Sequence, residues 1–447
     1  MQMRDELLSG GYRVDVNGWN FVHVEGGPGE IGFQHGYLLA ERIKESLDRA
    51  RLWATGALKV DWELFREKAE SLYIPHMPEE QRTEVHGIVQ GMDSRGLKSD
   101  HIDIIALNGL FDTQTFCNWN KHKSAGATRE LPPHVGGCSA FIATGTHTKG
   151  EGIVAAHNTW FEYLTGRMWN VILHAYPEKG NYLLMQTMPG LLASGTDWYI
   201  NSSGLVVTET TISGSVAFNP DGAPFFTRAR KAIQYAGSID EWISIMVDKN
   251  NGGYANDWLI GDTKTGEIAL LELGTFHHKV EKKSDGYFVG CNIAIDPEVR
   301  KETVFNYKDL TNSPCSRQER LIQLMEENKG KIDTEKAKEI LADHFDPSLN
   351  TSVPSRGSVC GHVEEDPRGY PEAEWGPSYP GGSFDGKVTS SSLVARGAMW
   401  AAWGKPCGKT FHANEFLKSY PAYNWQRELL SNIEAHPWTL FEQGFKA

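Results

Sequence analysis

The pattern of apolar residues changes near residue 138, and this change limits the folds that the chain can adopt. Before it, apolar residues recur at helical spacing, as along residues 34–53, where one apolar stripe lies opposite charged side chains. After it, short β-type runs such as 139–144 and 152–157 are separated by turns that contain Gly and Asn. A helical front followed by many strands, with helices between them, predicts an α+β fold built in layers.

The same patterns predict the individual elements. Further strands are expected at 181–187, 204–210, 257–262, 267–274, 388–395 and 398–404. Further helices are expected at 78–92, 99–111, 224–248 and 316–328. Pro78 suits the first turn of its helix, and Ser99 or Asp100 suits the cap of the next one. Two breaker-rich stretches are expected as loops, 118–137 and the longer, lid-like 354–386.

Charge and composition exclude several classes of partner. The 447-residue chain carries a net charge of −13, which disfavours nucleic acids and anionic membranes as partners. No stretch approaches the ~20 apolar residues that cross a bilayer, so we expect no integral membrane segment. The first residues lack the basic and apolar regions of a secretory signal, which predicts a cytoplasmic protein.

The cysteines and histidines do not form a recognisable metal motif. Six cysteines are spread along the chain without a CxxC pair: Cys117, Cys138, Cys291, Cys315, Cys360 and Cys407. This spacing predicts neither a disulfide scaffold nor a zinc ribbon. The adjacent His277 and His278 point to opposite faces of a strand, and the chain has no HExxH segment. We therefore expect no bound metal and no cofactor.

One further segment resembles a phosphate-binding loop and is set aside. Residues 381–388 (GGSFDGKV) fit GxxxxGK, but Val388 replaces the Ser or Thr that would bind Mg²⁺. The segment also lies in a Pro- and Gly-rich stretch instead of a turn from a strand to a helix. The sequence predicts no nucleotide site there.

Cys138 occupies an unusual position, because it begins an apolar run directly after two glycines. Residues 139–144 and 152–157 predict a hairpin, and a turn centred between 147 and 150 places position 138 opposite 157–161. The thiol and the imidazole of His157 would then meet, an arrangement that activates cysteine nucleophiles. The alternative is that Cys138 is a buried filler and His157 an ordinary strand residue.

The Gly137–Cys138 bond suits self-cleavage. A cysteine thiol can attack the preceding carbonyl when the backbone is strained and accessible, and glycines permit that geometry. Hydrolysis of the resulting thioester frees the α-amine of Cys138. An α-amine has a pKa of about 7.7–8, so it can act as the base for its own thiol. One residue would then supply both the nucleophile and the base.

Several segments together resemble one known family. They are GGPGEIGFQHGYLLAERI, HIDIIALNGLFD, GCSAFIATG, HNTWFEY, GGYANDWLIGD, NSPCSRQERLIQLM and KVTSSSLVA. Their order and spacing resemble the N-terminal-nucleophile (Ntn) hydrolases, in the group of acyl-CoA:6-aminopenicillanic acid acyltransferases and phospholipase B-like proteins. HNTWFEY is similar to the His-Thr-Thr-Trp motif of phospholipase B-like proteins. The resemblance covers nearly the whole chain and implies a four-layer αββα sandwich.

The resemblance also implies roles for individual residues. Cys138 matches the nucleophile that autoproteolysis after Gly137 would free, and His157 matches a position where relatives carry a cation near the thiolate. Asn256 matches an amide that helps bind the oxyanion, and Arg317 matches an arginine held near the nucleophile.

The substrate-binding positions are less regular. Asn158 and Trp160 follow His157 directly and are assigned to substrate binding. The bile-salt hydrolase branch of the family has Asp at the position of Trp160, where it contacts the nucleophile's amine. Its replacement by Trp leaves the partner of that amine open.

These observations predict a self-processing enzyme with a Cys138 thioester that cleaves or transfers an acyl group at a linear amide bond. Residues 1–137 would form a mainly helical small chain and 138–447 the catalytic chain, and both would stay associated in one structural body. The partner would be a small acyl substrate, whose identity the sequence leaves open together with the oligomeric state. One alternative is a phospholipase B-like hydrolase of lipid esters, and another is a non-cleaving binding protein on the same fold.

Overall fold

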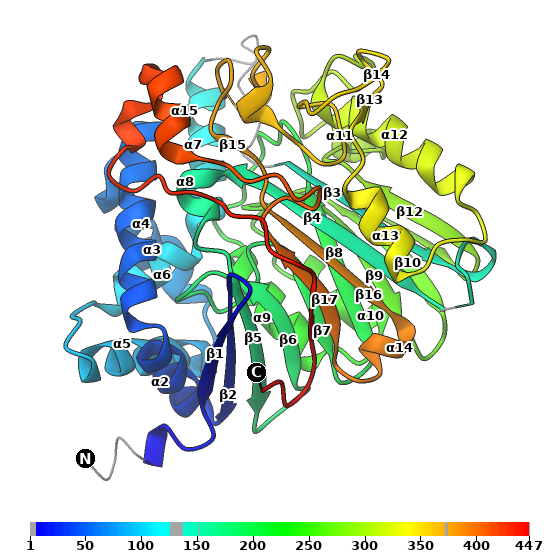
Figure 1. Ribbon diagram of the computed structural model, residues 1–447. Helices are drawn as coiled ribbons and strands as arrows, with labels where there is room; N and C mark the ends of the chain where they lie inside the picture. Colours follow the sequence, from blue (N-terminus) through cyan, green and yellow to red (C-terminus); the bar gives the residue numbers. More distant parts are fainter. Residues whose placement is uncertain (1–5, 126–136, 151, 372–373, 447) are drawn as a thin grey trace.

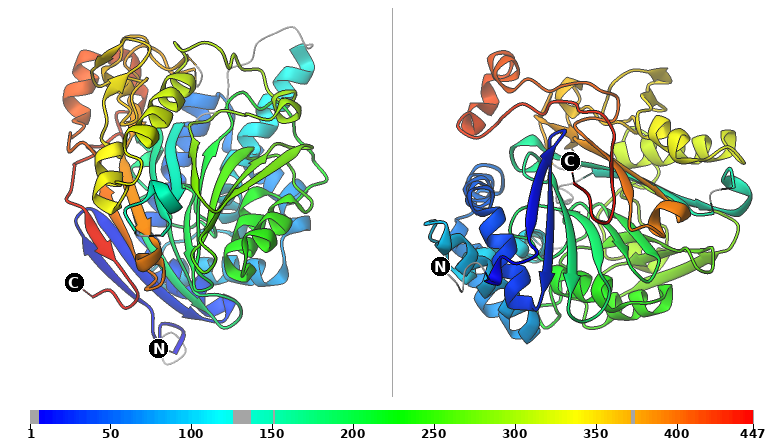
Figure 2. Two further views of the ribbon diagram at one scale, coloured as in Figure 1. Left: turned by 90° about the vertical axis from the view of Figure 1, so that its right-hand side faces the viewer. Right: turned by 60° about the horizontal axis from the view of Figure 1, so that its bottom comes forward.

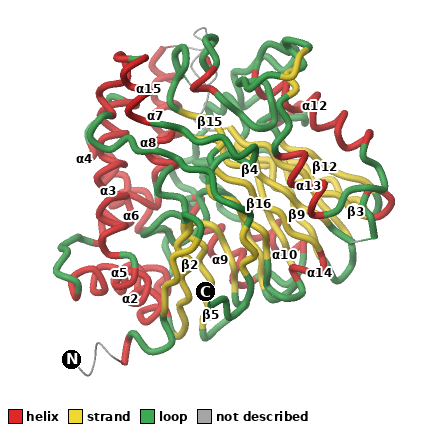
Figure 3. The backbone as a smooth tube through the Cα atoms, in the orientation of Figure 1, coloured by secondary structure: helices red, strands yellow, loops and turns green. Residues whose placement is uncertain are grey.

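Two β-sheets pack face to face at the centre of the molecule, and helices lie around them (Figure 1). The computed structural model describes residues 6–125, 137–150, 152–371 and 374–446. Figure 3 shows the strands gathered at the centre, with helices on either side. The protein is therefore a mixed α/β structure with several sheets.

The larger sheet contains nine strands in the part of the chain that the structure describes. In order across the sheet they are β1 (Tyr12–Val16), β2 (Trp19–Gly26), β5 (Val171–Pro177), β6 (Leu183–Thr187), β7 (Trp198–Asn201), β8 (Leu205–Thr211), β9 (Asn256–Asp262), β10 (Glu267–Leu273) and β11 (His278–Lys283). Neighbouring strands are antiparallel except β2 and β5, which are parallel.

The second sheet joins strands from the middle and the end of the chain. In order they are β12 (Gly286–Gly290), β3 (Gly137–Thr144), β4 (Val154–Glu162), β16 (Asp385–Ser390), β17 (Met399–Trp403) and β18 (Thr439–Phe441), with β15 (Gly381–Ser383) also paired to β4. A two-stranded ribbon, β13 (Phe345–Asp346) and β14 (Thr351–Ser352), lies outside both sheets. This order brings β16 beside β4, although the two strands are far apart in sequence.

Helices cover the outer faces of the sheets. Their bounds are α2 (Pro28–Leu38), α3 (Ala40–Trp53), α4 (Trp62–Lys68), α5 (Glu79–Ser94), α6 (His101–Asn108), α7 (Leu110–Ala125), α8 (Tyr163–Gly166), α9 (Phe225–Tyr235), α10 (Ile239–Val247), α11 (Pro297–Arg300), α12 (Ser313–Glu327), α13 (Thr334–Leu341), α14 (Ser391–Val394) and α15 (Ala413–Ser419). α2, α9 and α10 pack on the nine-stranded sheet, and α12 and α13 pack on the other sheet. Within the described residues, no helix is long and apolar enough to span a bilayer.

The faces of β3 show how the hydrophobic core is divided. Ala140 and Ile142 belong to the large core that includes the nine-stranded sheet, and Phe141 and Ala143 belong to a second core that includes residues of α12 and α13. Successive residues of a strand point to opposite faces, so one face of β3 points between the sheets and the other points towards the helices. The strand is buried on both faces.

Most predicted elements are present, and several differ in extent or were not predicted. A hairpin, β1–β2, precedes the first predicted helix. Figure 2 shows the C-terminal segment beside this hairpin, and the Phe441 ring stacks on the Phe21 ring at 5.9 Å. Leu39 separates the stretch 34–53 into α2 and α3.

A predicted loop and the end of a predicted strand also differ from the structure. The predicted loop 118–137 is helical as far as Ala125, its residues 126–136 lie outside the described part, and Gly137 begins β3. The predicted strand 388–395 ends at Ser390 and continues as α14, in which small polar residues make a short helical turn. Asp100, one of the two expected caps, accepts a hydrogen bond from the Asp103 N–H at the start of α6.

Candidate active site

Cys138 lies at the start of β3, directly opposite Thr159 of β4. This register confirms the predicted hairpin, because Thr159 lies within the expected range 157–161. A Cβ atom at Gly137 would lie only 3.1 Å from the Trp160 ring, so the position before Cys138 favours glycine. The sequence therefore places the thiol at the end of a strand, with a residue before it that leaves little room for a side chain.

The Cys138 side chain points between the two sheets. It shares this face with Ala140, Thr159 and His157, because residues two apart on a strand, and residues paired across strands, lie on the same face. Cys138 is buried. A thiol at this place is surrounded by residues of both sheets and is shielded from bulk water.

A buried cation lies beside the thiol. Lys387 of β16 is fully buried and donates a 2.6 Å hydrogen bond to Thr159 Oγ1. Its Nζ also lies 3.2 Å from a carboxylate oxygen of Asp385, and Asp385 accepts hydrogen bonds from the Thr159 N–H and from Gln186 Nε2, both 2.8 Å long. The positive charge is therefore held in place by a paired carboxylate.

A pair of carboxyl groups comes from the nine-stranded sheet and its edge, with Glu209 on β8 and Asp197 directly before β7. Asp197 and Glu209 are both buried, and burial is the main reason why the pKa of each is raised. Each also acts on the other, and the Cys138 thiol lies close enough to Glu209 to raise its pKa further. Asp197 accepts a 2.9 Å hydrogen bond from the Tyr254 hydroxyl. Because both carboxyls resist ionisation, the pair retains a proton at a pH where exposed carboxyls have lost theirs.

The Cys138 thiol is not activated in the intact chain. Burial raises its pKa to about 12, while the Trp160 backbone N–H and the charge on Lys387 act in the opposite direction. Asp197 and Asp385 add to the increase. A thiol with such a pKa needs a base before it can act as a nucleophile near neutral pH.

The backbone of Cys138 is held by Asn292 and Arg317. Asn292 Oδ1 accepts a 3.0 Å hydrogen bond from the Cys138 N–H and a 2.8 Å bond from Arg317 Nη2. Arg317 Nη1 donates to the Cys138 carbonyl oxygen and, at 3.2 Å, to Ser139 Oγ. Arg317 thus lies next to the backbone of the proposed nucleophile, from which it is 179 positions distant in sequence.

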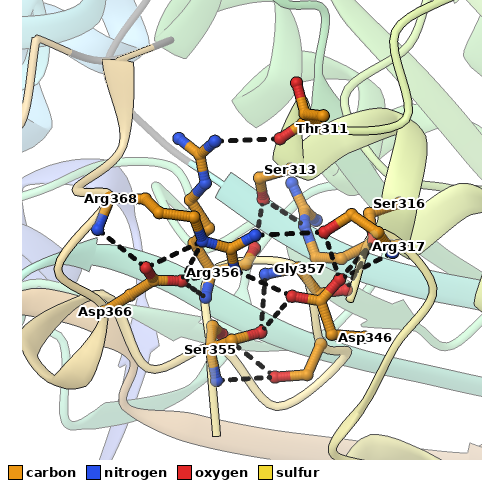
Figure 4. Close-up of polar contacts among 12 residues, drawn as sticks. Thr311, Ser313, Ser316, Arg317, Asp346, Ser355, Arg356, Gly357, Asp366 and Arg368 are labelled. Atoms are coloured by element: carbon orange, nitrogen blue, oxygen red, sulfur yellow. Dashed lines mark hydrogen bonds and ion pairs between the residues drawn. The ribbon is translucent and has the colours of Figure 1, made fainter. Parts of the chain in front are cut away.

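Arg317 is positioned by a polar network between α12, β13 and the loop that follows β14, shown in Figure 4. Ser313 accepts a 3.0 Å hydrogen bond from Arg317 Nε and donates to the backbone oxygen of Arg356. Asp346 accepts hydrogen bonds from Ser316 and Ser355 and forms an ion pair with Arg368. The helix that carries Arg317 and the loop are therefore fixed to each other.

Asn256 begins β9 and lies beside the acidic pair. With its amide oriented so that its donors face acceptors, Nδ2 donates to Glu209 Oε2 at 2.9 Å and to the Ala255 carbonyl oxygen at 2.7 Å. Asn256 is fully buried. The structure therefore connects the predicted oxyanion donor to Glu209.

His157 lies diagonally across from Cys138. It is paired with Ala140, and such diagonal positions on adjacent strands are separated by about 7–8 Å. Burial, helped by the charge on Lys387, keeps its pKa well below the ordinary value, so the ring is neutral. The cation that was expected at His157 is instead present at Lys387, its partner on β16.

Asn158 and Trp160 lie on the other face of β4. Asn158 Oδ1 accepts from the Ser139 N–H and from Trp160 Nε1, both at 3.2 Å, and its Nδ2 donates to the carbonyl oxygens of Leu341 and Val359. The guanidinium of Arg317 lies 4.3 Å from the centre of the Trp160 ring. These two predicted substrate-binding residues thus make their contacts behind the strand, away from the thiol.

A narrow apolar pocket lies beside the acidic pair. It is lined by side chains of α6, α7, α9 and the segment 188–195, among them Phe111 and Leu191. The Phe111 ring stacks on Tyr254 at 4.7 Å, and Tyr254 is bonded to Asp197. Tyr254 therefore lies between the pocket residue Phe111 and Asp197, and it contacts both.

The sequence analysis missed Lys387, Asp385, Asp197, Glu209 and Asn292. Two of them belong to the segment that resembles a phosphate-binding loop, where charged residues alternate along a fully buried strand. Such alternation is a signal of a buried polar site. Asp197 and Asn292 also have positive φ angles of 55° and 69°, but these strained conformations are visible only in the structure.

The chain is similar in sequence to several known proteins. A family model described as Phospholipase B matches residues 82–350, which include Cys138 and Arg317. An uncharacterized protein of Archaeoglobus fulgidus is 24% identical over 75% of this chain and 60% of its own length. Phospholipase B of Crotalus adamanteus is 26% identical over 65% of this chain and 54% of its own length.

A human relative shows a shorter match. Phospholipase B-like 1 of Homo sapiens is 30% identical over 32% of this chain and 27% of its own length. The chain spans less than two thirds of the length of these curated relatives. The family model, in contrast, matches more than half of the chain. This chain therefore belongs to the phospholipase B family.

Proposed function

We propose that this protein is a self-processing cysteine hydrolase of the Ntn type that cleaves acyl bonds of lipid-like substrates. One observation carries the proposal. Cys138 is the second residue of β3, with its thiol between the sheets, beside Lys387 and near Glu209, and its N–H is bonded to Asn292. Helices outside two packed sheets also suit the four-layer αββα sandwich of Ntn hydrolases.

The first step would be cleavage of the chain. Cys138 Sγ attacks the Gly137 carbonyl carbon, and the thiol proton passes to the Cys138 nitrogen. The Gly137–Cys138 C–N bond then breaks, which leaves Gly137 as a thioester on Cys138 Sγ. Water then hydrolyses the thioester, which leaves a carboxylate at Gly137 and a free thiol and α-amine at Cys138. Asn292 Oδ1, which accepts from the Cys138 N–H in the intact chain, would hold the new amine.

The α-amine would be the base that the thiol lacks. In the intact chain the pKa of Cys138 is about 12, so the thiol is protonated near neutral pH. A free amine beside it, with a pKa near 8, accepts the thiol proton, and Lys387 favours the thiolate that forms. Cleavage would therefore convert an inactive precursor into an active enzyme.

Turnover would follow the same chemistry on an external acyl group. The thiolate attacks the acyl carbonyl carbon, and an amide donor at Asn256, once it faces the developing oxyanion, stabilises it. The leaving alcohol or amine takes the proton from the α-amine, and water then hydrolyses the acyl-thioester. The acidic pair Asp197–Glu209 would position Asn256 through its hydrogen bond.

The two chains would stay together after cleavage. The hairpin β1–β2 is part of the nine-stranded sheet, and β2 pairs with β5 over seven positions. Residues before and after the cleavage site thus share one sheet. This shared sheet supports the domain assignment of 1–137 and 138–447 as parts of one body.

The choice of a lipid-like ester as substrate rests on two observations. The matching family model is described as Phospholipase B, and the relative from Crotalus adamanteus carries the same name. An amide substrate would use the same residues, and a binding protein on this fold would leave the chain uncleaved.

The test measures fatty-acid release from lysophospholipids and from N-acyl amides by wild-type protein and Cys138→Ala. We expect cleaved wild type to hydrolyse esters, and Cys138→Ala to show no activity. Amide hydrolysis alone would overturn the substrate assignment. An intact wild-type chain without activity after long incubation would overturn the enzyme assignment.

A further inference from the structure

Four potential metal ligands meet at a place apart from the candidate active site. His344, Cys360, His362 and Cys407 each offer one ligand atom, and these four atoms all lie within 4.8 Å of one another. Cys360 and His362 are buried, and His344 and Cys407 are partly buried. They come from three separate segments: the residue before β13, the loop that follows β14, and the loop that follows β17.

The three distances from His362 Nε2 to the other ligand atoms match the edges of a tetrahedron around a metal ion. His362 Nε2 lies 3.1 Å from His344 Nε2, 3.6 Å from Cys360 Sγ and 3.5 Å from Cys407 Sγ. Zinc bonds of about 2.05 Å to nitrogen and about 2.3 Å to sulfur give tetrahedral edges of about 3.3 Å between nitrogens and about 3.6 Å between nitrogen and sulfur. We propose that His344, Cys360, His362 and Cys407 bind one zinc ion.

The second nitrogen of His362 supports this assignment. While Nε2 faces the other three ligands, Nδ1 lies 3.2 Å from Glu364 Oε1 and 3.4 Å from Glu365 Oε1. Metal-bound histidines commonly donate their other N–H to a carboxylate, which fixes the ring and its tautomer. The ring is thus oriented with one nitrogen towards the cluster and the other towards a carboxylate.

The two glutamates do not form a separate metal site with His362. Glu364 is paired with Lys405 at 2.7 Å, and Glu365 is paired with Lys409 at 2.6 Å. Tyr163 also donates to Glu364. Because lysine cations already neutralise these carboxylates, the metal belongs on the sulfur side of His362.

The ligand set indicates a structural zinc ion. Two thiolates and two imidazoles in a tetrahedral arrangement are typical of structural zinc, while Mg²⁺ and Ca²⁺ prefer oxygen ligands. Four protein ligands also leave no open position for a substrate, in contrast to catalytic zinc sites. The proposed ion would therefore hold segments together and take no part in the reaction.

The segments that the ion would join lie directly behind the nucleophile strand. Val359, which precedes Cys360, accepts hydrogen bonds from Ser139 Oγ at 3.3 Å and from Asn158 Nδ2 at 3.0 Å. A Cβ at Gly361 would overlap the Trp160 ring. The loop is thus held by the polar network of Figure 4 on one side and by the proposed ion on the other.

The first test measures metals in wild-type protein purified under reducing conditions with zinc in the growth medium. We expect about one zinc ion per chain by elemental analysis, and release of it by a strong chelator should lower Tm. Replacement by Co²⁺ should give the absorption bands of thiolate-to-cobalt charge transfer and of tetrahedral cobalt. A metal content near zero, or a different metal at one per chain, would overturn the proposal.

Variants assign the ion to these residues. Cys360→Ser with Cys407→Ser should lose the ion, and Cys117→Ser, a cysteine of α7 outside the cluster, should keep it. If the double variant fails to fold, His344→Gln at the partly exposed edge and the cobalt spectrum of wild type give the same information. Zinc retained in His344→Gln and in the double variant, or lost in Cys117→Ser, would place the ion elsewhere.

A disulfide is the competing explanation for two neighbouring cysteines. Mass analysis of unreduced, alkylated protein separates the two explanations, because a zinc site leaves both thiols free for alkylation after denaturation. A Cys360–Cys407 disulfide in freshly purified protein would overturn the proposal. This readout does not depend on chain cleavage or on hydrolysis, so it is independent of the proposed function.

Discussion

The two faces of β4 carry different chemistry, although their residues are consecutive in sequence. His157 and Thr159 point between the sheets with Cys138, where Lys387 donates to Thr159 and the charge on Asp197 acts on the thiol. Asn158 and Trp160 point towards the helices and the loop, where they bond to backbone groups and to each other. The face with Cys138 carries charged and ionisable groups. The other face carries groups whose hydrogen bonds hold the strand in place.

This difference shows how a motif must be divided before roles are assigned. The sequence analysis assigns His157, Asn158 and Trp160 to one site, but a strand sends its side chains alternately to opposite faces. Residues two apart therefore share an environment, and adjacent residues do not. The division predicts that substitutions on the Cys138 face change the reaction, and substitutions on the other face change stability.

The largest effect is expected for Cys138→Ala. Both proposed attacks use the same sulfur, so this variant should remain an intact, folded precursor without turnover. Wild type should give two fragments of roughly 15 and 34 kDa, in proportion to 137 and 310 residues of the 49.8 kDa chain. The larger fragment should begin with Cys-Ser-Ala-Phe. Normal cleavage of Cys138→Ala would place the nucleophile elsewhere, with Cys117 as the next candidate.

Much of the fold could be predicted from apolar periodicity. β3, β4, β9 and β10 follow the expected runs closely, because each is an apolar stretch bounded by turn residues. The sequence analysis missed the hairpin β1–β2, although Tyr12, Val14 and Val16 alternate with polar residues and Asn17–Gly18 is a typical hairpin turn. Propensity alone also could not show that residues 391–394 (SSLV) are helical.

The site was only partly predictable, because sheet order is a tertiary property. Lys387 reaches Thr159 across 228 positions of sequence, and only the placement of β16 beside β4 brings them together. The proposed zinc ligands were hidden for the same reason. His362 lies 2 positions from Cys360 but 45 from Cys407, which fits no common zinc spacing.

The next largest effect is expected for Asn256→Ala in cleaved protein. Loss of one oxyanion donor typically lowers kcat by ~10²–10³. KM should change little for a substrate whose ground-state carbonyl does not use that donor. Asn256→Asp should be slower still, because a carboxylate would face the developing negative charge. Steady-state kinetics on the ester and amide panel measures both values, and a wild-type kcat in Asn256→Ala would remove the residue from the oxyanion site.

A smaller effect is expected when the buried cation is removed. Lys387→Met alone would leave Asp385 as an unpaired buried charge, so the double variant Lys387→Met, Asp385→Asn is preferable. Each pKa unit by which Lys387 favours the thiolate changes its population tenfold, and loss of the Asp385 charge offsets part of this effect. The value of kcat/KM should therefore fall by up to about tenfold, and its pH profile should move to higher pH. The exposed Lys44→Met is the control. An unchanged pH profile in the double variant would contradict a role for Lys387 at the thiol.

The acidic pair should leave a signature in the pH dependence of stability. The pKa of Asp197 is raised by burial, so the folded state binds more protons than the unfolded state above pH ~4. Stability from this group is thus present at lower pH and is lost as pH rises through the folded pKa. Asp197→Asn should remove this loss and raise stability at pH 8 by on the order of 1–2 kcal/mol relative to wild type.

A matched variant separates this effect from function. Asp257, which lies on β9, is also a buried carboxyl, and its pKa is raised by burial and by Glu272. Asp257→Asn should show the same direction of stability change at pH 8 but keep its activity, while Asp197→Asn should lose activity. Denaturant unfolding at pH 5 and pH 8, with kinetics on the same samples, measures both. Equal activity in the two variants would show that the Asp197–Glu209 pair has no part in the reaction.

The smallest effect on the reaction is expected from the supporting face. Asn158→Ala removes the acceptor of the Ser139 N–H and of Trp160 Nε1, and leaves Val359 with one donor fewer. Unmet buried groups of this kind should cost about 2–4 kcal/mol of stability, yet kcat and KM of cleaved protein should stay near the wild-type values. The neighbouring substitution Thr159→Val should lower kcat and change stability little, because it removes only the hydrogen bond from Lys387 at the thiol. Calorimetry and steady-state kinetics on both variants make the comparison. A raised KM in Asn158→Ala at unchanged Tm would instead return Asn158 to substrate binding and would contradict the division of β4 into two faces.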